Sequence, residues 1–270
     1  MISRAERVLN HSVLILVSIF VLFPVVWFLF TALSPNRSGQ LDLLHPQWSN
    51  FVTAWNAGGF GSAMIASTVI TVGAVVGQTV LAILSGFAFG VLGVAGQKVL
   101  FPVILLGLMI SAEVFIVPLY YTFQSIGLTN SWLGLIIIQI GMGVPFGAFW
   151  MRATFRAVPP SLIEAAEMDG ARSWRILWQV LLPISRPAVL TLALLSFMWT
   201  WNDFFLSLVF IADPAIQPVT LALGVFQGKN TLDVNLMAAA SVIVAVPVLI
   251  LYAFFQRHFI SGVLNGAIKE

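Results

Sequence analysis

Residues 164–187 have the sequence EAAEMDGARSWRILWQVLLPISRP, the most informative stretch of the chain. A Glu-Ala-Ala triplet begins it at Glu164, Gly170 follows, and Leu182-Pro183 comes twelve residues after the glycine. The stretch is charged and bounded by prolines, and it lies between two long apolar runs. This pattern predicts a short helical segment outside the membrane, in a chain that otherwise spans it.

The composition is that of a membrane protein. The 270 residues are 60% hydrophobic and 8% charged, whereas soluble domains carry about 25% charged residues. Cysteine is absent and the three histidines lie far apart, so we expect no disulfide, no metal site and no catalytic residue. A net charge of +2 gives no indication of nucleic-acid binding.

Six apolar runs are long enough to cross a bilayer, which takes about 20 residues per helix. Lipid offers no partner for open backbone groups, so each run is expected to be helical. The first run is too long for the core of a cleaved signal peptide. We therefore predict an all-α membrane protein of one domain, 1–270, with six transmembrane helices at about 12–33, 62–92, 100–123, 132–151, 188–211 and 236–255.

The basic residues indicate the orientation, because short cytoplasmic loops are enriched in Lys and Arg. With the amino terminus inside, ten of the twelve fall in cytoplasmic segments. This predicts that both termini and the loop 152–187 are cytoplasmic. The ten are Arg4, Arg7, Lys98, Arg152, Arg156, Arg172, Arg175, Arg186, Arg257 and Lys269, and the two in outer loops are Arg37 and Lys229.

The loop has a purely structural interpretation. Ser161 and Glu164 have the spacing of a capping box, in which the Ser caps a helix and the Glu reaches back to its amide. Gly170 has the position of a glycine that ends a short helix in a left-handed conformation. This interpretation does not account for the two alanines or for Leu182-Pro183.

A docking interpretation accounts for more of the pattern. The small side chains of Ala165 and Ala166 would let the helix approach a groove on another protein closely. Glu164, Glu167 and Asp169 would supply carboxylates for its Arg or Lys residues. Beyond Gly170, Trp174, Leu177, Trp178 and Leu181 recur at helical spacing, which predicts an interfacial amphipathic helix that ends at Pro183.

Small residues four apart occur in two of the predicted spans. Such pairs let helix backbones approach closely. They serve either packing within the bundle or association with a second membrane subunit. The pairs are Gly73/Gly77, Gly86/Gly90 and Gly143/Gly147.

The loop resembles the EAA loop of binding-protein-dependent ABC importers, in which EAA is followed by Gly and then by Ile, any residue and Leu-Pro. Only the Ile differs, since Val180 replaces it. From the second span onward the chain is similar to the carbohydrate-uptake, maltose-type branch and its smaller six-helix subunit. The further matches are IVPLY at 116–120 before GL at 127–128, WNDF at 201–204, and a tail at 261–269 that departs from the family pattern at Val263 and Asn265.

The resemblance implies a type I ABC importer permease fold in which the loop is a cytoplasmic coupling helix. It implies alternating access in a bacterial or archaeal inner membrane, driven by two copies of a separate ATPase subunit that bind ATP and Mg. A second permease subunit, an extracytoplasmic solute-binding protein and a sugar or sugar-like solute are the other expected partners. No Walker A pattern occurs in the chain. The implied ATPase-contacting residues are Glu164, Ala165, Ala166, Glu167, Asp169, Gly170, Leu182 and Pro183 in the loop, and Gly262, Gly266 and Lys269 in the tail.

Two acids fall within predicted spans, Glu113 and Asp203. Intramembrane acids are costly and usually face a cavity or a partner, so they either line the solute pathway or fix the packing of the bundle. Trp199, Trp201 and Asn202 beside Asp203 offer the aromatic faces and amides of a sugar site. An ion-coupled transporter using Glu113 and Asp203 is the alternative, although such proteins are expected to show repeated halves.

Overall fold

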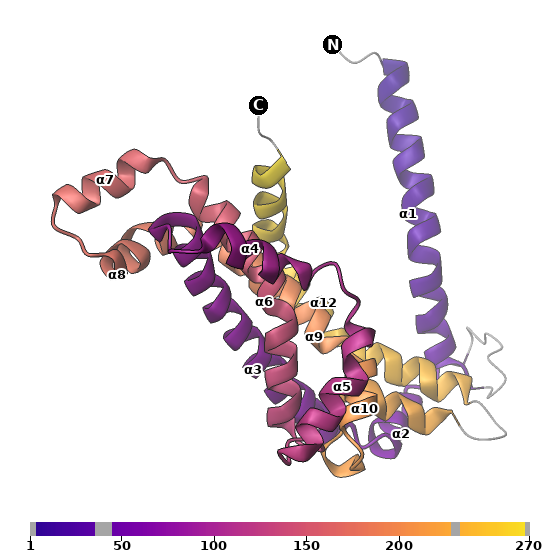
Figure 1. The fold of residues 1–270 in the computed structure, drawn as a ribbon. Helices are drawn as coiled ribbons and strands as arrows, with labels where there is room; N and C mark the ends of the chain where they lie inside the picture. The colour runs from indigo at the N-terminus through magenta and orange to yellow at the C-terminus, as the bar shows by residue number, and fades with distance from the viewer. Residues whose placement is uncertain (1–3, 36–44, 228–232, 268–270) are drawn as a thin grey trace. The chain divides into compact units, whose positions relative to one another are not determined.

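The structure is a computed structural model that describes residues 4–35, 45–227 and 233–267. The described chain is almost entirely helical (Figure 1). It divides into two compact units, residues 1–61 with 222–246, and residues 62–221 with 247–270. Five of its helices are long and apolar enough to cross a membrane: Leu9–Leu33, Phe60–Leu92, Trp132–Arg156, Ser173–Trp201 and Val234–Gln256.

The predicted span at 100–123 differs from the structure, because it is two helices. These are α4 (Gln97–Leu106) and α5 (Ala112–Ser125). Helix α4 ends at Gly107, a residue with low helix propensity, and an added Cβ there would lie 2.7 Å from Pro145 Cγ. Ser111 then takes an extended conformation before α5. Residues 100–123 therefore do not form one continuous helix.

The predicted span at 188–211 also differs. Its helix begins earlier, at Ser173, as α8 (Ser173–Ile176), the π-helix η2 (Leu177–Leu181) and α9 (Leu182–Trp201). It ends at Asn202, whose side-chain amide donates to Met198 O at 2.8 Å. A new helix, α10 (Phe205–Phe210), follows. Asn and Asp side chains compete with the helix for backbone partners, which explains the interruption.

The first unit contains α1 (Arg4–Leu33), α2 (Ser49–Ala57), the 3₁₀ turn η4 (Leu223–Phe226) and the beginning of α12 (Val234–Ala267). The last carbonyls of a helix lack intrahelical partners, and here two asparagines supply them. Asn50 Nδ2 donates to Ala32 O and Ser34 O, both at 3.0 Å. Asn235 Nδ2 donates to Ser34 O at 2.6 Å. Residues 9–30 of α1 are exposed along their whole length.

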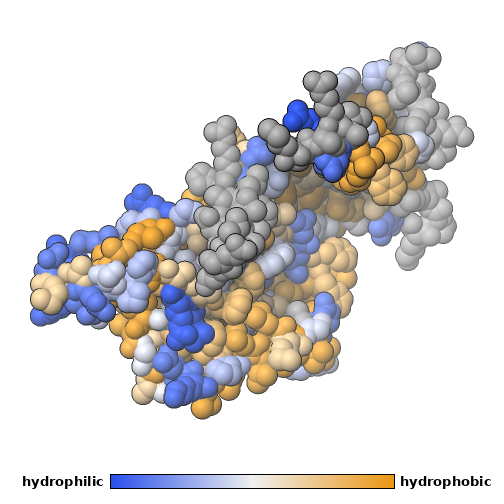
Figure 2. All heavy atoms as spheres, turned by 90° about the horizontal axis from the view of Figure 1, so that it is seen from above, coloured by the Kyte–Doolittle hydropathy of each residue, from blue (hydrophilic) through white to orange (hydrophobic). Residues whose placement is uncertain are grey.

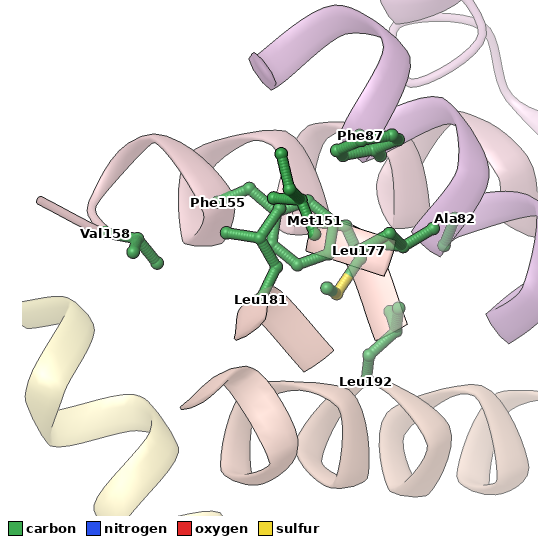
Figure 3. Packing of buried hydrophobic residues seen from close by; sticks show 9 residues of the cluster. Ala82, Phe87, Met151, Phe155, Val158, Leu177, Leu181 and Leu192 are labelled. Atoms are coloured by element: carbon green, nitrogen blue, oxygen red, sulfur yellow. The ribbon is translucent and has the colours of Figure 1, made fainter. Parts of the chain in front are cut away.

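The second unit is a bundle of three long helices with an apolar cluster at each end. The bundle consists of α3 (Phe60–Phe87) with its π-helical end η1 (Ala88–Leu92), α6 (Trp132–Arg156) and α9. One cluster lies at the end where α6 leads into α7 (Pro160–Met168), and Leu177 and Leu181 at its centre are completely buried (Figure 3). The other, with Ile70, Leu135 and Phe210, lies at the α10 end.

The glycine pairs bring α3 and α6 together within the chain. An added Cβ at Gly73 would lie 2.9 Å from Ile136, one at Gly86 would lie 2.5 Å from Met151 Cβ, and one at Gly147 would lie 2.6 Å from Ala82 Cβ. Gly77 likewise faces Ile140, Gly90 faces Arg152, and Gly143 faces Gln78. All three pairs therefore serve packing inside the bundle, which was the simpler of the two interpretations.

At the α10 end, Asn130 ties the turn before α6 to the segment after α10. It has a left-handed φ of +53°, a conformation that Asn tolerates better than most residues. Its Oδ1 accepts from the amides of Ala212 and Asp213 at 3.0 and 2.9 Å. The following residues form short turns, η3 (Pro214–Ile216) and α11 (Val219–Ala222), and Val219 N donates to Ser67 Oγ at 2.8 Å. The connection between the predicted spans at 188–211 and 236–255 is thus well anchored where it begins.

Candidate functional site

Helices α7 and α8 form a hairpin at one end of the second unit (Figure 1). Hydrophilic side chains gather at this end in Figure 2, whereas apolar ones cover much of the remaining visible face. Helix α7 begins at Pro160, whose fixed φ suits the first helical position. The prediction of a short helix over this polar stretch is confirmed.

Helix α7 ends in a Schellman motif around Gly170. Gly170 has a φ of +77°. Its amide donates to Glu167 O at 2.9 Å, and the amide of Ala171 donates to Ala166 O at 2.9 Å. These are the two bonds that define the motif. The left-handed conformation predicted for Gly170 is confirmed, and it turns the chain back toward α8.

The predicted capping box is wrong. The N-cap residue is Pro159, and no side chain caps the helix. With the helix beginning at Pro160, Glu164 is the fifth helical residue, beyond the third position from which it could reach back to the cap. The preceding Pro-Pro pair explains the shift, because the Pro160 ring is already set in helical conformation. Capping therefore does not explain Glu164.

One face of α7 holds the helix on its own unit. Ile163 and Ala166 are half-buried and pack against the apolar cluster of Phe155, Leu177 and Leu181. The two alanines of the triplet therefore have different surroundings, since Ala165 is exposed. Ala166 contributes to the anchoring of α7, and only Ala165 remains free for a partner.

Helix α7 also carries exposed apolar side chains. Met168 is 88% exposed and Leu162 is 45% exposed, with Ala165 between them. We refer to Leu162, Ala165 and Met168 as the outer face of α7. A charged hairpin that presents apolar side chains outward, while its other face is anchored, has the form of a docking element.

The carboxylates of α7 have separate positions. Glu164 and Glu167 border a cleft of about 460 Å³ between α7 and the ends of α3 and α6, together with Arg156. Asp169 is exposed at the C-cap. Leu182 packs against the apolar cluster below the hairpin, and Pro183 is exposed in the first turn of α9.

The predicted amphipathic helix at 172–182 differs from the structure in two respects. It does not end at Pro183 but continues to Trp201. Trp174 and Trp178 are 59% and 54% exposed, whereas Leu177 and Leu181 are buried, so the four do not share a face. The π-helix η2, closed by a bond from Leu182 N to Leu177 O, interrupts the α-helical period that the prediction assumed.

The candidate pathway residues lie in three different settings. Glu113 is exposed in the first turn of α5, where the Ser111 hydroxyl donates to its carboxylate. Trp201 is buried, and the side-chain amide of Asn202 donates a hydrogen bond to Met198 O at the end of α9. Trp199 and Asp203 together border a cavity of about 310 Å³.

Several other residues that line this cavity are not predicted from the sequence as pathway residues: Gln78, Gln139, Gly143 and Thr200. The available signal was the presence of two glutamines within apolar spans. Asp203 Oδ2 accepts from the amide and hydroxyl of Ser207 at 3.1 and 3.2 Å. Asp203 therefore both stabilises the first turn of α10 and reaches the cavity.

Only part of the carboxy-terminal tail that is predicted to contact the ATPase lies within the described residues. Gly262 and Gly266 fall in the helical backbone of α12, and Lys269 lies outside the described residues. Among the described residues, no cluster of His, Cys, Asp and Glu could hold a metal ion.

The fold is that of an ABC importer membrane subunit. A chain of a bacterial ABC transporter involved in the import of the acidic polysaccharide alginate matches it with a TM-score of 0.81 at 22% identity, over 96% of this chain and 99% of that chain. Residues 78–264 match the family described as "binding-protein-dependent transport system inner membrane component".

Two curated relatives extend over nearly the whole chain. The diacetylchitobiose uptake system permease protein NgcG of Streptomyces coelicolor is 30% identical over 98% of this chain and 90% of its own. The trehalose transport system permease protein SugB of Mycobacterium tuberculosis is 29% identical over 93% of each chain. The chain belongs to the family of inner-membrane components of binding-protein-dependent transport systems. It is a permease component rather than an enzyme, and the family decides against the ion-coupled alternative.

Proposed function

We propose that this chain is one permease subunit of an ATP-driven, binding-protein-dependent importer of a sugar or sugar-like solute. It pairs with a second permease subunit and works by alternating access. Two copies of an ATPase subunit bind ATP and Mg, and an extracytoplasmic solute-binding protein delivers the solute. The names of the relatives, which include diacetylchitobiose and trehalose systems, support the sugar class.

The observation that carries this proposal is the outer face of α7. Apolar side chains on a polar hairpin are unfavourable in water, and Met168 is 88% exposed. A partner that covers Leu162, Ala165 and Met168 would remove this surface from water, and each Å² of apolar surface buried in this way stabilises the complex by about 25 cal/mol. The ATPase is that partner in our proposal, and the basic residues around the hairpin support a cytoplasmic position for it and for both termini.

The anchored face explains how movement would be transmitted. Ile163 and Ala166 pack on the cluster that contains Leu177 and Leu181, and these belong to the same continuous helix as Trp199. A close-packed cluster transmits displacement because it has little free volume. ATP-driven movement of α7 would thus reach α9 and the bundle.

Placing a charged, bulky side chain on the outer face of α7 tests whether the ATPase docks there. Ala165→Arg changes an exposed residue, so we expect the chain to fold and to insert while its ATPase no longer co-purifies and ATP-driven uptake is lost. Ala57→Arg on α2 is the matched control, because Ala57 is also exposed and lies in a predicted outer loop. Retention of the ATPase by Ala165→Arg, or its loss from both variants, would contradict the docking role.

A further inference from the structure

The cavity beside Asp203 lies between the two apolar clusters of the second unit. It measures about 310 Å³ and is bordered by α3, α6 and the end of α9. Ligand pockets begin at about 300 Å³. Gln139 is seven residues into α6, which at 1.5 Å per residue places it about 10 Å along the helix. The cavity is therefore within the membrane-spanning part of the unit.

Three polar side chains that are more than nine-tenths buried meet there. Gln78 and Gln139 are each 6% exposed and Thr200 is 7% exposed. Gln78 Nε2 donates to the backbone oxygen of Gln139 at 2.7 Å. The side-chain amide of Gln139 and the hydroxyl of Thr200 form no hydrogen bond with any described residue.

These groups are not sealed away. Among the described residues, the buried side-chain polar atoms that lack both a partner and surface access belong to Thr79, Gln97, Ser185 and Asn235. Gln139 and Thr200 are absent from that set and border the cavity. Their free donors and acceptors are therefore open to it. A ligand with hydroxyl groups could therefore form hydrogen bonds with them in the cavity.

Backbone packing makes room for this arrangement. A Cβ at Gly143 would collide with the side-chain amide of Gln78. Gly143 thus leaves the space in which Gln78 reaches across to α6. The same glycine pair that packs α6 on α3 also admits a polar side chain between them.

An aromatic platform and a single charge complete the cavity. Trp199 is 54% exposed, and it is held edge-to-face against Phe146 with ring centroids 5.0 Å apart at 78°. Its ring face carries negative charge density, which suits the C–H groups of a sugar ring. Among the described lining residues Asp203 alone is charged, and it forms no salt bridge with any other residue that the structure describes.

We propose that this cavity is a subsite for one neutral, hydroxyl-rich ring of the transported solute. Gln78, Gln139 and Thr200 hydrogen-bond to its hydroxyls and Trp199 packs against its face. Asp203 accepts a hydroxyl hydrogen and repels a carboxylate, so rings that carry an acid group are disfavoured. The proposal rests on the proposed function. It distinguishes this chain from the alginate importer subunit whose fold it shares, because alginate is acidic.

The absence of cysteine from the chain allows a direct test. Thr200→Cys and Gln139→Cys place one thiol in the cavity, and Ser185→Cys on α9 places one at a sealed position. The complex with its ATPase, in lipid nanodiscs, is treated with neutral, cationic and anionic methanethiosulfonates, without nucleotide and with ATP and vanadate. Modification is measured on this chain by intact-mass spectrometry.

We expect neutral and cationic reagents to modify both cavity cysteines and to leave Ser185→Cys unmodified. Adding Asp203→Asn should speed the anionic reagent by about tenfold, because a nearby unit charge in a partly desolvated site has an effect of this order. Glucose, trehalose or N,N′-diacetylchitobiose should slow modification, and glucuronate should not. Two cavity positions keep the test valid if one variant fails to fold.

Lack of modification at both cavity positions would overturn the proposal, as would equal modification of Ser185→Cys. Modification that none of the three neutral sugars slows would show a water-filled cavity only. Protection by glucuronate equal to that by the neutral sugars would overturn the charge preference. In each of these cases ATP-dependent uptake by the unsubstituted complex and co-purification of its ATPase would persist, so failure of the subsite is distinguishable from failure of the proposed function.

Discussion

Replacement of Gly170 tests the turn on which the hairpin depends. Gly170 has a φ of +77°, and an added Cβ would meet no heavy atom within 4 Å. The cost of Gly170→Ala is therefore conformational, and a left-handed residue with a Cβ costs about 1–2 kcal/mol. Gly170→Leu should cost the same, because the extra atoms meet open space. Gly170→Asn should cost less, since Asn is enriched in this conformation.

Hydrogen exchange measures this cost directly. The amides of residues 170 and 171 are the donors of the two Schellman bonds, at 2.9 Å each. A loss of about 1–2 kcal/mol corresponds to about 5- to 30-fold faster exchange of these amides through local opening. The measurement is made on the purified chain in nanodiscs, and amides in the middle of α6 provide the internal reference.

A cost that rises with side-chain volume from Ala to Leu would refute the conformational argument, because it would mean that the site is crowded. Equal exchange in the Ala and Asn variants would also refute it. In the assembled complex, the Ala variant should hydrolyse ATP with reduced uptake per ATP. Wild-type coupling in that variant would show that the turn is not needed for transmission.

Two further substitutions test the bundle by thermal unfolding in detergent. Gly86→Ala should destabilise the protein by about 1–3 kcal/mol, because the added Cβ would lie 2.5 Å from Met151 Cβ. Gly141→Ala on α6 is the control and should be neutral or mildly stabilising, because an added Cβ there meets nothing within 4 Å. Equal effects of the two substitutions would contradict the close approach of the helices at Gly86. Leu177→Ala removes a side chain with no exposed surface and should cost about 2–5 kcal/mol, more than Trp178→Ala at 54% exposure. The reverse order would contradict the burial of the η2 leucines.

Local chemistry allowed the loop to be predicted. The left-handed turn at Gly170 depends on one residue type and its position after a helix, so the sequence alone indicates it. The long spans are likewise indicated by the length of apolar runs. The predicted capping box is wrong because the helix begins at Pro160, one residue before Ser161. Both residues are typical of a helix start, and the sequence alone does not decide between them.

The missed features depend on tertiary packing. The burial of Leu177 and the exposure of Trp178 follow from the π-helix η2, whose irregular hydrogen bonds have no simple sequence signature. The cavity requires Gln78 on α3 to contact Gln139 on α6. The hydrophobic periodicity of each helix does not indicate which of its residues face the other helix. The spacing of Gly143 and Gly147 indicates packing, but it does not identify Gln78 as the neighbour of Gly143.

We propose that ATP hydrolysis by a separate subunit, transmitted through the outer face of α7, drives uptake. The most direct measurement is the uptake of radiolabelled trehalose and N,N′-diacetylchitobiose by proteoliposomes that contain the whole complex and the solute-binding protein. We predict uptake of a neutral sugar that requires ATP, ignores a proton ionophore and disappears with Ala165→Arg. Uptake that persists without the ATPase subunit and follows the proton gradient would contradict this coupling.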